Sequence, residues 1–172
     1  MPETVIVISD ANILFDLLTS ELMEAFCRLP FQRWTSDFIL QEIRDPNQKQ
    51  IVDNIIENNE LHIRESTFEE IITIKSFQER YKPLSISDCS VWLMAKEMNA
   101  RLLSGDRKLR IVAEADGIEV SGILFVFDKL IENGIIDFQT AVDKLKYLMS
   151  VNNRLPEAEC AEKLKEWSSS SL

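Results

Sequence analysis

The sequence has few of the residues from which disulfide frameworks and zinc sites are built. Its three cysteines, Cys27, Cys89 and Cys160, are odd in number and far apart, no CxxC pair is present, and His62 is the only histidine. A disulfide framework needs paired cysteines, and zinc prefers thiolate and imidazole ligands. The sequence therefore indicates neither kind of site, and we expect the three thiols to be free and buried.

Glycine and long apolar runs are also scarce. Only 4 of the 172 residues are glycine, and no glycine-rich turn follows the first apolar segment, which argues against a dinucleotide-binding turn. No segment approaches the roughly 18 consecutive apolar residues that span a bilayer, and the N-terminus lacks a basic region followed by an apolar run. We therefore expect a cytoplasmic protein that makes no contact with a membrane.

Positive charge is in deficit. The chain has 19 lysines and arginines against 29 aspartates and glutamates, which gives a formal net charge of −10. Contacts to phosphate normally come from Lys and Arg, so this balance argues against a protein that simply coats nucleic acid. The deficit is a smaller obstacle if several of the acids hold divalent cations, because a bound cation can reverse the local sign of the field.

Short apolar segments alternate along the chain with segments of helical periodicity. The size and the hydrophobic content of 45% fit one globular domain. Strands are predicted at residues 5–9, 31–35, 61–64, 101–104 and 118–121. Helices are predicted at 11–28, in a short stretch before Pro46, at 49–58, from a capping box at Ser66 and Glu69 to about 80, and at 87–99, 107–115, 123–132, 138–151 and 156–167. This alternation predicts an α/β fold with a parallel sheet covered by helices on both faces.

Four acidic residues fall where this fold would gather them. Asp10 follows the first strand and Asp106, in RLLSGD, follows the fourth, so both lie at the edge formed by the carboxyl ends of the strands. Asp88 is in the first turn of the helix that feeds the fourth strand, which returns it to the same edge. Glu42 lies about a turn into the helix after the second strand, close enough to lean inward.

Each acid has an ordinary structural explanation. Asp10 and Asp106 are good N-caps, Asp88 complements a helix dipole, and Glu42 could be a solvated helix residue. As a group they are harder to explain, because four carboxylates at one edge repel one another unless they are protonated or share cations.

Oxygen ligands of this kind suit Mg²⁺ or Mn²⁺, and the chemistry that fits such a site is hydrolysis of a phosphodiester bond. The four acids would be the metal ligands and catalytic residues, and one of them could orient the attacking water. Asn12 and Ser104 are expected to hydrogen-bond the ligands, and Asp16 is a third supporting candidate further along the first helix.

Four stretches of the sequence resemble the PIN-domain ribonucleases, the family that includes the VapC-type toxins of bacterial and archaeal toxin–antitoxin pairs. They are VIVISDANILFDLL, the glutamate of FILQEI, SISDCSVWLMAKEMNARLLSGDRKLR and GIEVSGILFVFDKLIENGIID, and together they extend over residues 5–137. The third stretch is the most specific, as an Asp–helix–strand–Ser-x-Asp unit. By this resemblance the acidic cluster of the family corresponds to Asp10, Glu42, Asp88 and Asp106, and its frequent Thr or Ser corresponds to Ser104.

The resemblance implies a three-layer α/β/α sandwich, here with a central parallel sheet of about five strands, and metal-dependent cleavage of RNA. It also implies a frequent homodimer, in some members held inactive by a protein antitoxin. Residues 1–137 would form the PIN-like nuclease domain. Residues 138–172 would form a helical extension, packed on or beside that domain, that the shorter toxins lack; a PIN subgroup with C-terminal extensions is similar. Arg107, Lys108 and Arg110, just after Asp106, are the best candidates for phosphate contacts, with an ordinary solvated helix start as the alternative.

Two functions from different classes follow. The first is an Mg²⁺- or Mn²⁺-dependent endoribonuclease, with the toxin of a toxin–antitoxin pair as one version of it. The second is a catalytically silent PIN-like scaffold that binds a protein partner through the added helices. A phosphate-transfer enzyme with Asp10 as nucleophile is weaker, because Asn12 stands where a general-acid aspartate is expected.

Overall fold

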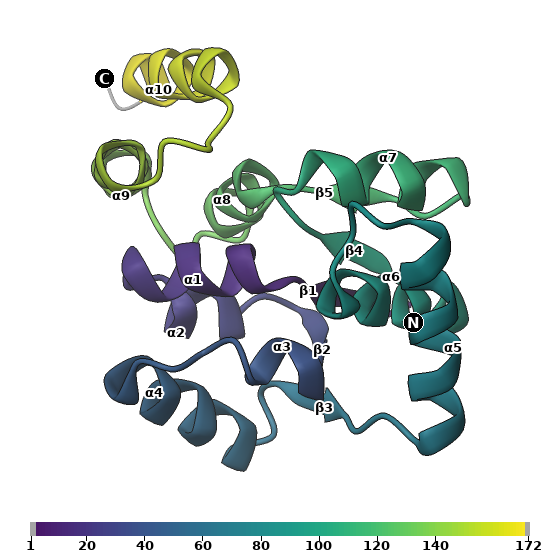
Figure 1. Cartoon of the computed structure of the whole chain (residues 1–172). Helices are drawn as coiled ribbons and strands as arrows, with labels where there is room; N and C mark the ends of the chain where they lie inside the picture. Colours follow the sequence, from purple (N-terminus) through teal and green to yellow (C-terminus); the bar gives the residue numbers. More distant parts are fainter. Residues whose placement is uncertain (1–2, 171–172) are drawn as a thin grey trace.

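Five parallel strands form one sheet at the centre of the molecule (Figure 1). The computed structural model describes residues 3–170. The strands are β1 (Val5–Ser9), β2 (Phe31–Ser36), β3 (His62–Arg64), β4 (Arg101–Leu103) and β5 (Val120–Ser121), and they lie in the order β3-β2-β1-β4-β5. The prediction of a parallel sheet of about five strands is confirmed.

β1 is the central strand because it is apolar on both faces. Val7 and Ile8, on opposite faces of the strand, are both fully buried. β2 lies on one side of β1, with Val7 opposite Arg33, and β4 lies on the other side, with Ile8 opposite Leu102. The direction in which successive strands are added therefore reverses at β1.

Helices cover both faces of the sheet, which makes the fold a three-layer α/β/α sandwich (Figure 1). One face carries α1 (Ala11–Thr19), α2 (Met23–Cys27) and α8 (Ile123–Glu132), and the other is crossed by α6 (Ile86–Met98), with α5 (Phe68–Arg80) and α7 (Arg107–Ala115) beside it. The short α3 (Asp37–Leu40) and the longer α4 (Pro46–Glu57) connect β2 to β3. The predicted α/β/α arrangement is confirmed.

The prediction of one helix over residues 11–28 is wrong, because the chain breaks it into α1 and α2. Glu21 adopts a left-handed backbone conformation with φ of 59°. Its N–H donates to the Leu18 carbonyl and the N–H of Leu22 donates to the Leu17 carbonyl, the paired bonds of a Schellman motif that ends a helix. Leu22 is thereby turned into the core, where it is buried, so the apolar spacing continues across a break in the backbone.

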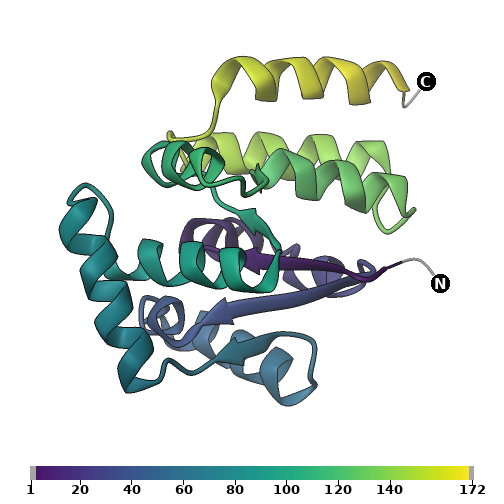
Figure 2. The same ribbon diagram turned by 90° about the vertical axis from the view of Figure 1, so that its right-hand side faces the viewer.

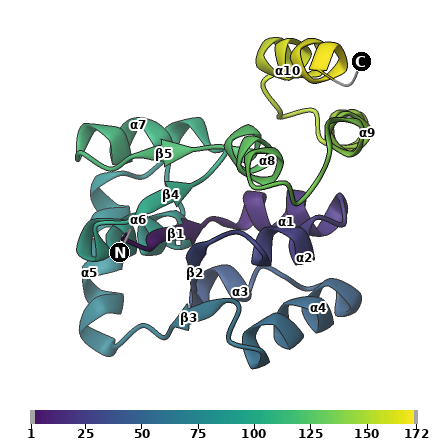
Figure 3. The ribbon, with the colours of Figure 1, turned by 180° about the vertical axis from the view of Figure 1, so that it is seen from behind.

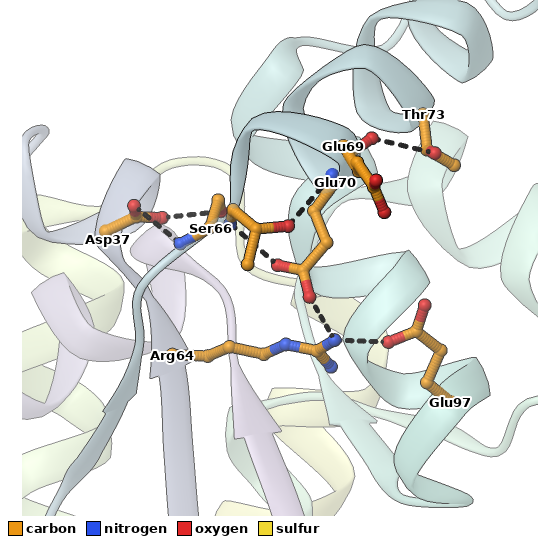
Figure 4. Close-up of polar contacts among 8 residues, drawn as sticks. Asp37, Arg64, Ser66, Glu69, Glu70, Thr73 and Glu97 are labelled. Carbon is orange, nitrogen blue, oxygen red and sulfur yellow. Dashed lines mark hydrogen bonds and ion pairs between the residues drawn. The ribbon is translucent and has the colours of Figure 1, made fainter.

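The capping box of α5 lies one residue later than predicted. Thr67 caps the helix and accepts from the N–H of Glu70, whose carboxylate accepts from the N–H of Thr67. Ser66 has a different partner, since its hydroxyl and its N–H both donate to the carboxylate of Asp37 (Figure 4). Because Ser66 makes this long-range contact, it does not form the predicted capping box with Glu69.

Arg64 joins the end of β3 to both helices of the α5–α6 hairpin. Its guanidinium lies between the carboxylates of Glu70 in α5 and Glu97 in α6 and forms an ion pair with each (Figure 4). Such partly exposed pairs contribute little stability, about 0–1 kcal/mol each. They connect the start of α5 and the end of α6 to the end of β3.

The last two helices, α9 (Phe138–Val151) and α10 (Glu157–Ser170), lie outside α8 as a pair (Figures 2 and 3). The predicted bounds of α8 and α9 are confirmed, and α10 extends a few residues beyond its prediction. α10 packs along α9 and also reaches α8, where the Trp167 and Phe127 rings lie 5.6 Å apart and Lys163 forms an ion pair with Asp128. The two helices are thus attached to α8, and α9 is also joined to α1 by the hydrogen bond from Asn152 to Asp16.

The remaining observations concern the cysteines, the histidine and the lengths of the helices. All three cysteines are free and buried. His62 lies half-buried in β3, where its ring packs against that of Trp34. Within residues 3–170, no helix is both long and apolar enough to cross a membrane.

Candidate functional site

Asp10 and Asp106 lie on either side of the switch point of the sheet, the point between β1 and β4 at which the strand order reverses. β1 and β4 are neighbours, yet the chain reaches them from opposite directions, and ligands of open α/β sheets bind at such a point, beyond the carboxyl ends of the strands. Asp10 directly follows β1, and its N–H donates to the Leu103 carbonyl at the end of β4, at 2.9 Å. Asp106 follows β4 after a two-residue turn.

Ser104 connects these two acids. Its hydroxyl donates to Oδ2 of Asp10 at 2.8 Å and accepts from the N–H of Asp106 at 3.1 Å. Oδ1 of Asp10 accepts from the N–H of Ala11 at 2.8 Å, so Asp10 caps α1 as Asp106 caps α7. Asp10 is only 4% exposed. The structure therefore shows the capping role of both residues, and that role leaves the carboxylates at the same edge of the sheet.

Asp88 approaches from the first turn of α6, as predicted. Ser85 caps this helix, and Oδ2 of Asp88 accepts from the N–H of Ser85 at 2.9 Å in a second capping box. The hydrogen bonds leave Asp88 half-buried. A sequence-local motif thus holds this carboxylate, which interacts electrostatically with Asp10 and Asp106.

Glu42 lies in a turn, and its predicted place about one turn into a helix is wrong. α3 ends at Leu40, and the N–H groups of Glu42 and Ile43 donate to carbonyls three residues back. A short turn follows, and Asp45 then adopts an extended conformation as the N-cap of α4. Ile39 and Ile43 are nevertheless buried on either side of Glu42, which remains exposed.

The four carboxylates are close enough to repel one another. The pKa of Asp10 is raised to about 7, chiefly by burial and in addition by the carboxylates of Asp88 and Glu42, while the hydrogen bonds from Ser104 and Ala11 act in the opposite direction. The pKa of Asp88 is raised by burial and by Asp106, and that of Glu42, an exposed residue, is raised by partial desolvation of its carboxyl group and by Asp88. Each of the four carboxylates therefore interacts with at least one of the others. We call Asp10, Glu42, Asp88 and Asp106 the acidic cluster.

The cluster offers only oxygen donors, the type that Mg²⁺ and Mn²⁺ prefer. Among residues 3–170, no three His, Cys, Asp or Glu side chains stand arranged to hold one metal ion. Mg²⁺ is usually held by one or two carboxylates, with waters and substrate phosphates completing its shell. The donor chemistry therefore fits a hydrated hard cation better than an ion fully enclosed by protein.

The three supporting residues predicted from the sequence have three different partners. Ser104 bonds Asp10 directly. Asn12 holds the loop before Asp106, because its Oδ1 accepts from the N–H of Gly105 at 3.2 Å. The carboxylate of Asp16 bonds none of the four acids and instead accepts from Nδ2 of Asn152, at 2.8 Å, in the turn after α9.

A cleft of about 940 Å³ opens beside the acidic cluster, between the start of α7 and the turn that joins α9 to α10. Asp106 belongs to both the cluster and the cleft. The predicted phosphate contacts Arg107 and Lys108 line the cleft and are exposed. Arg110 lines it too, but its guanidinium is engaged with the Val120 carbonyl and with Glu114.

Arg154, in the turn between α9 and α10, also lines the cleft, and the sequence alone did not predict this position. A single arginine between two amphipathic helices has no local signal of function. Its place opposite Arg107 and Lys108 depends on how the last two helices pack, which periodicity does not reveal.

Comparisons with known proteins place the chain in a family. No curated protein matches it. Among solved structures it is similar to a PilT N-terminus domain protein from the hyperthermophilic archaeon Sulfolobus solfataricus P2, with 10% sequence identity over 74% of this chain and 95% of that chain and a TM-score of 0.44. A family model described as a PIN domain matches residues 6–169, nearly the whole sequence. The chain therefore belongs to the PIN-domain family.

Proposed function

We propose that the chain is a divalent-metal-dependent endoribonuclease whose active site is the acidic cluster. PIN domains are generally nucleases. The observation that supports the proposal most directly is the state of Asp10, which is buried at the switch point and carries a pKa raised to about 7 by burial and by the neighbouring Asp88 and Glu42. A cation at this point would relieve the repulsion among the carboxylates.

Each residue of the cluster has a proposed role. Asp10, Asp88 and Asp106 would hold Mg²⁺ or Mn²⁺, in part through coordinated waters, and the bound ion would lower the pKa of a coordinated water and stabilise charge on the leaving oxygen. Ser104 orients Asp10 through their hydrogen bond. Glu42 is the most exposed of the four and has a raised pKa, which suits a carboxylate that completes the metal shell and orients the attacking water.

The proposal extends to the substrate and to partners. RNA would bind through phosphates at Arg107 and Lys108, which compensate locally for the net charge of −10. A role as the toxin of a cytoplasmic toxin–antitoxin pair, with a protein antitoxin and a homodimer, is the more specific form of the same proposal.

Loss of a single carboxylate from the cluster is expected to reduce RNA cleavage by two orders of magnitude or more, about 100-fold being typical of one electrostatic group in a catalytic site. The variants are Asp10→Asn and Asp88→Asn, and the measurement is Mn²⁺-stimulated cleavage of a structured RNA by protein whose circular dichroism matches wild type. Asp53→Asn is the matched control, since Asp53 lies on α4, away from the cluster, with a half-exposed side chain that pairs with Lys49 at the surface. Cleavage at wild-type rates by both cluster variants would refute the assignment.

One observation favours the alternative of a catalytically silent scaffold, namely that no three acids of the described chain stand arranged around a single metal position. Calorimetric titration with Mg²⁺ and Mn²⁺ separates the two functions. A nuclease is expected to bind the ion at millimolar concentration or below, and to lose that binding in Asp88→Asn. Absence of any binding heat in wild type would favour the scaffold.

A further inference from the structure

The cleft beside the acidic cluster has two walls from distant parts of the chain. One wall consists of the start of α1, the loop around Asp106 and the first turns of α7 and α8, and the other is the turn between α9 and α10 with the start of α10. Its volume of about 940 Å³ lies at the upper end of the range for ligand clefts, about 300–1,000 Å³. Because Asp106 lies at its margin, a ligand in the cleft also borders the acidic cluster.

Hydrogen bonds fix the second wall in place. Asn152 donates from Nδ2 to the buried carboxylate of Asp16 in α1, at 2.8 Å, and its Oδ1 accepts from the N–H of Arg154 at 3.0 Å. A side chain at the end of α9 therefore holds the backbone of Arg154 at a set distance from α1. The helical extension is built into the cleft rather than loosely beside it.

The two walls together present three available cations. Arg107 and Lys108 come from one wall and Arg154 from the other, and all three are exposed. Within the described chain, none of the three lies within ion-pair distance of a carboxylate, whereas Arg110 is already engaged with Glu114 and the Val120 carbonyl. Two acids, Asp106 and Glu159, also line the cleft, but in a protein with a net charge of −10 a convergence of three cations outside any ion pair favours an anionic ligand.

The remaining lining indicates how that ligand is recognised. Its apolar part is aliphatic, from residues such as Ile123, Leu155 and Pro156, and no aromatic side chain of the described chain lines the cleft. Bases therefore have no ring on which to stack, which is the usual basis of base binding in single strands. Guanidinium groups, in contrast, match the geometry of phosphate.

We propose that the turn between α9 and α10 is the second wall of a cleft for single-stranded RNA, in which Arg154 contacts a backbone phosphate next to the bond cut at the acidic cluster. The identity of the ligand rests on the proposed nuclease function. Arg107 and Lys108 contact the same strand from the opposite wall, and recognition is through the backbone with little preference for sequence.

Arg154→Ala is expected to weaken RNA binding by about 5- to 20-fold, the effect of losing one charge-assisted contact, and to make the affinity less dependent on salt by about 0.7 in the log–log slope. The measurement is fluorescence anisotropy with a short labelled single-stranded RNA at several salt concentrations. All variants carry Asp88→Asn so that the RNA stays intact. Arg154→Lys is expected to recover most of the affinity, because the charge is retained.

Two further variants sharpen the test. Arg28→Ala removes the same side chain from the exposed end of α2, at the opposite edge of the sheet, and is expected to leave affinity unchanged. Glu159→Gln removes a negative charge from the wall that carries Arg154 and is expected to tighten binding.

If Arg154→Ala binds RNA as tightly as Arg28→Ala, the turn is not an RNA contact and the inference is wrong, whether or not wild type cleaves RNA. If wild type fails to cleave while the Arg154 effect is seen, the nuclease proposal fails and the binding cleft stands.

Discussion

Asp10→Asn is expected to make the metal-free protein more stable at neutral and alkaline pH while it abolishes cleavage. Burial, and then Asp88 and Glu42, raise the pKa of Asp10 in the folded state to about 7, against 3.8 for a free side chain. A carboxyl whose pKa is raised by folding stabilises the fold while it is protonated. This stabilisation is complete below the pKa of the side chain in the unfolded state, and it disappears as the pH rises toward the folded-state pKa of about 7. Above pH 7 the fold must bury the anion.

The size of the effect follows from the same shift. A pKa difference between about 7 and 3.8 corresponds to about 4 kcal/mol. Asparagine stays neutral at every pH. It has a single side-chain oxygen, however, whereas Asp10 accepts the bond from Ala11 on one carboxylate oxygen and the bond from Ser104 on the other. We therefore expect a net gain on the order of 1–3 kcal/mol above pH 7, after the loss of one hydrogen bond.

Thermal denaturation with a chelator present, compared between about pH 4 and pH 8, measures this gain. The unfolding temperature of Asp10→Asn should lie below that of wild type at the acid end, by the cost of the lost hydrogen bond, and above it as the pH rises. Asp53→Asn on the exposed face of α4 should follow wild type throughout. Added Mn²⁺ should raise the unfolding temperature of wild type and leave that of Asp10→Asn unchanged, because only wild type gains binding energy. Equal stability of the two proteins at pH 8 would show that burial of the Asp10 carboxylate does not destabilise the fold.

Trp167→Ala is expected to cause the largest loss of stability, about 3–5 kcal/mol. Trp167 is 1% exposed and its ring lies against Phe127, so it anchors α10 to α8. Its removal leaves a large cavity at the point where the extension joins the rest of the fold. Urea denaturation measures the loss, and Lys165→Ala, at an exposed site two residues earlier, serves as the control.

The shape of the urea transition also bears on domain organisation. If residues 138–172 behave as an extension, as we propose, Trp167→Ala should release them in a separate transition at low urea, before the sheet unfolds. A single transition would show that the extension and the sheet unfold together. A loss of less than about 1 kcal/mol, far below the usual cost of removing a buried tryptophan, would show that Trp167 does not anchor α10.

The sequence by itself determined the features that depend on local patterns. Hydrophobic periodicity located all five strands and most of the helices, because each element must bury one face or both. The positions of Asp10 and Asp106 after strands, and of Asp88 in the first turn of a helix, were predicted for the same reason. Parallel strands then bring these positions to one edge, so their proximity follows from the order of elements.

The tertiary structure alone decided how those side chains are held and what surrounds them. The bond from Ser104 to Asp10 depends on packing between segments that are distant in sequence, and the raised pKa of Asp10 depends on the exclusion of water. The same applies to Arg110, which is engaged with the Val120 carbonyl, and to the cleft that brings Arg154 opposite Arg107. Desolvation and long-range hydrogen bonds act through distance in space, and the pattern of residues along a chain does not specify those distances.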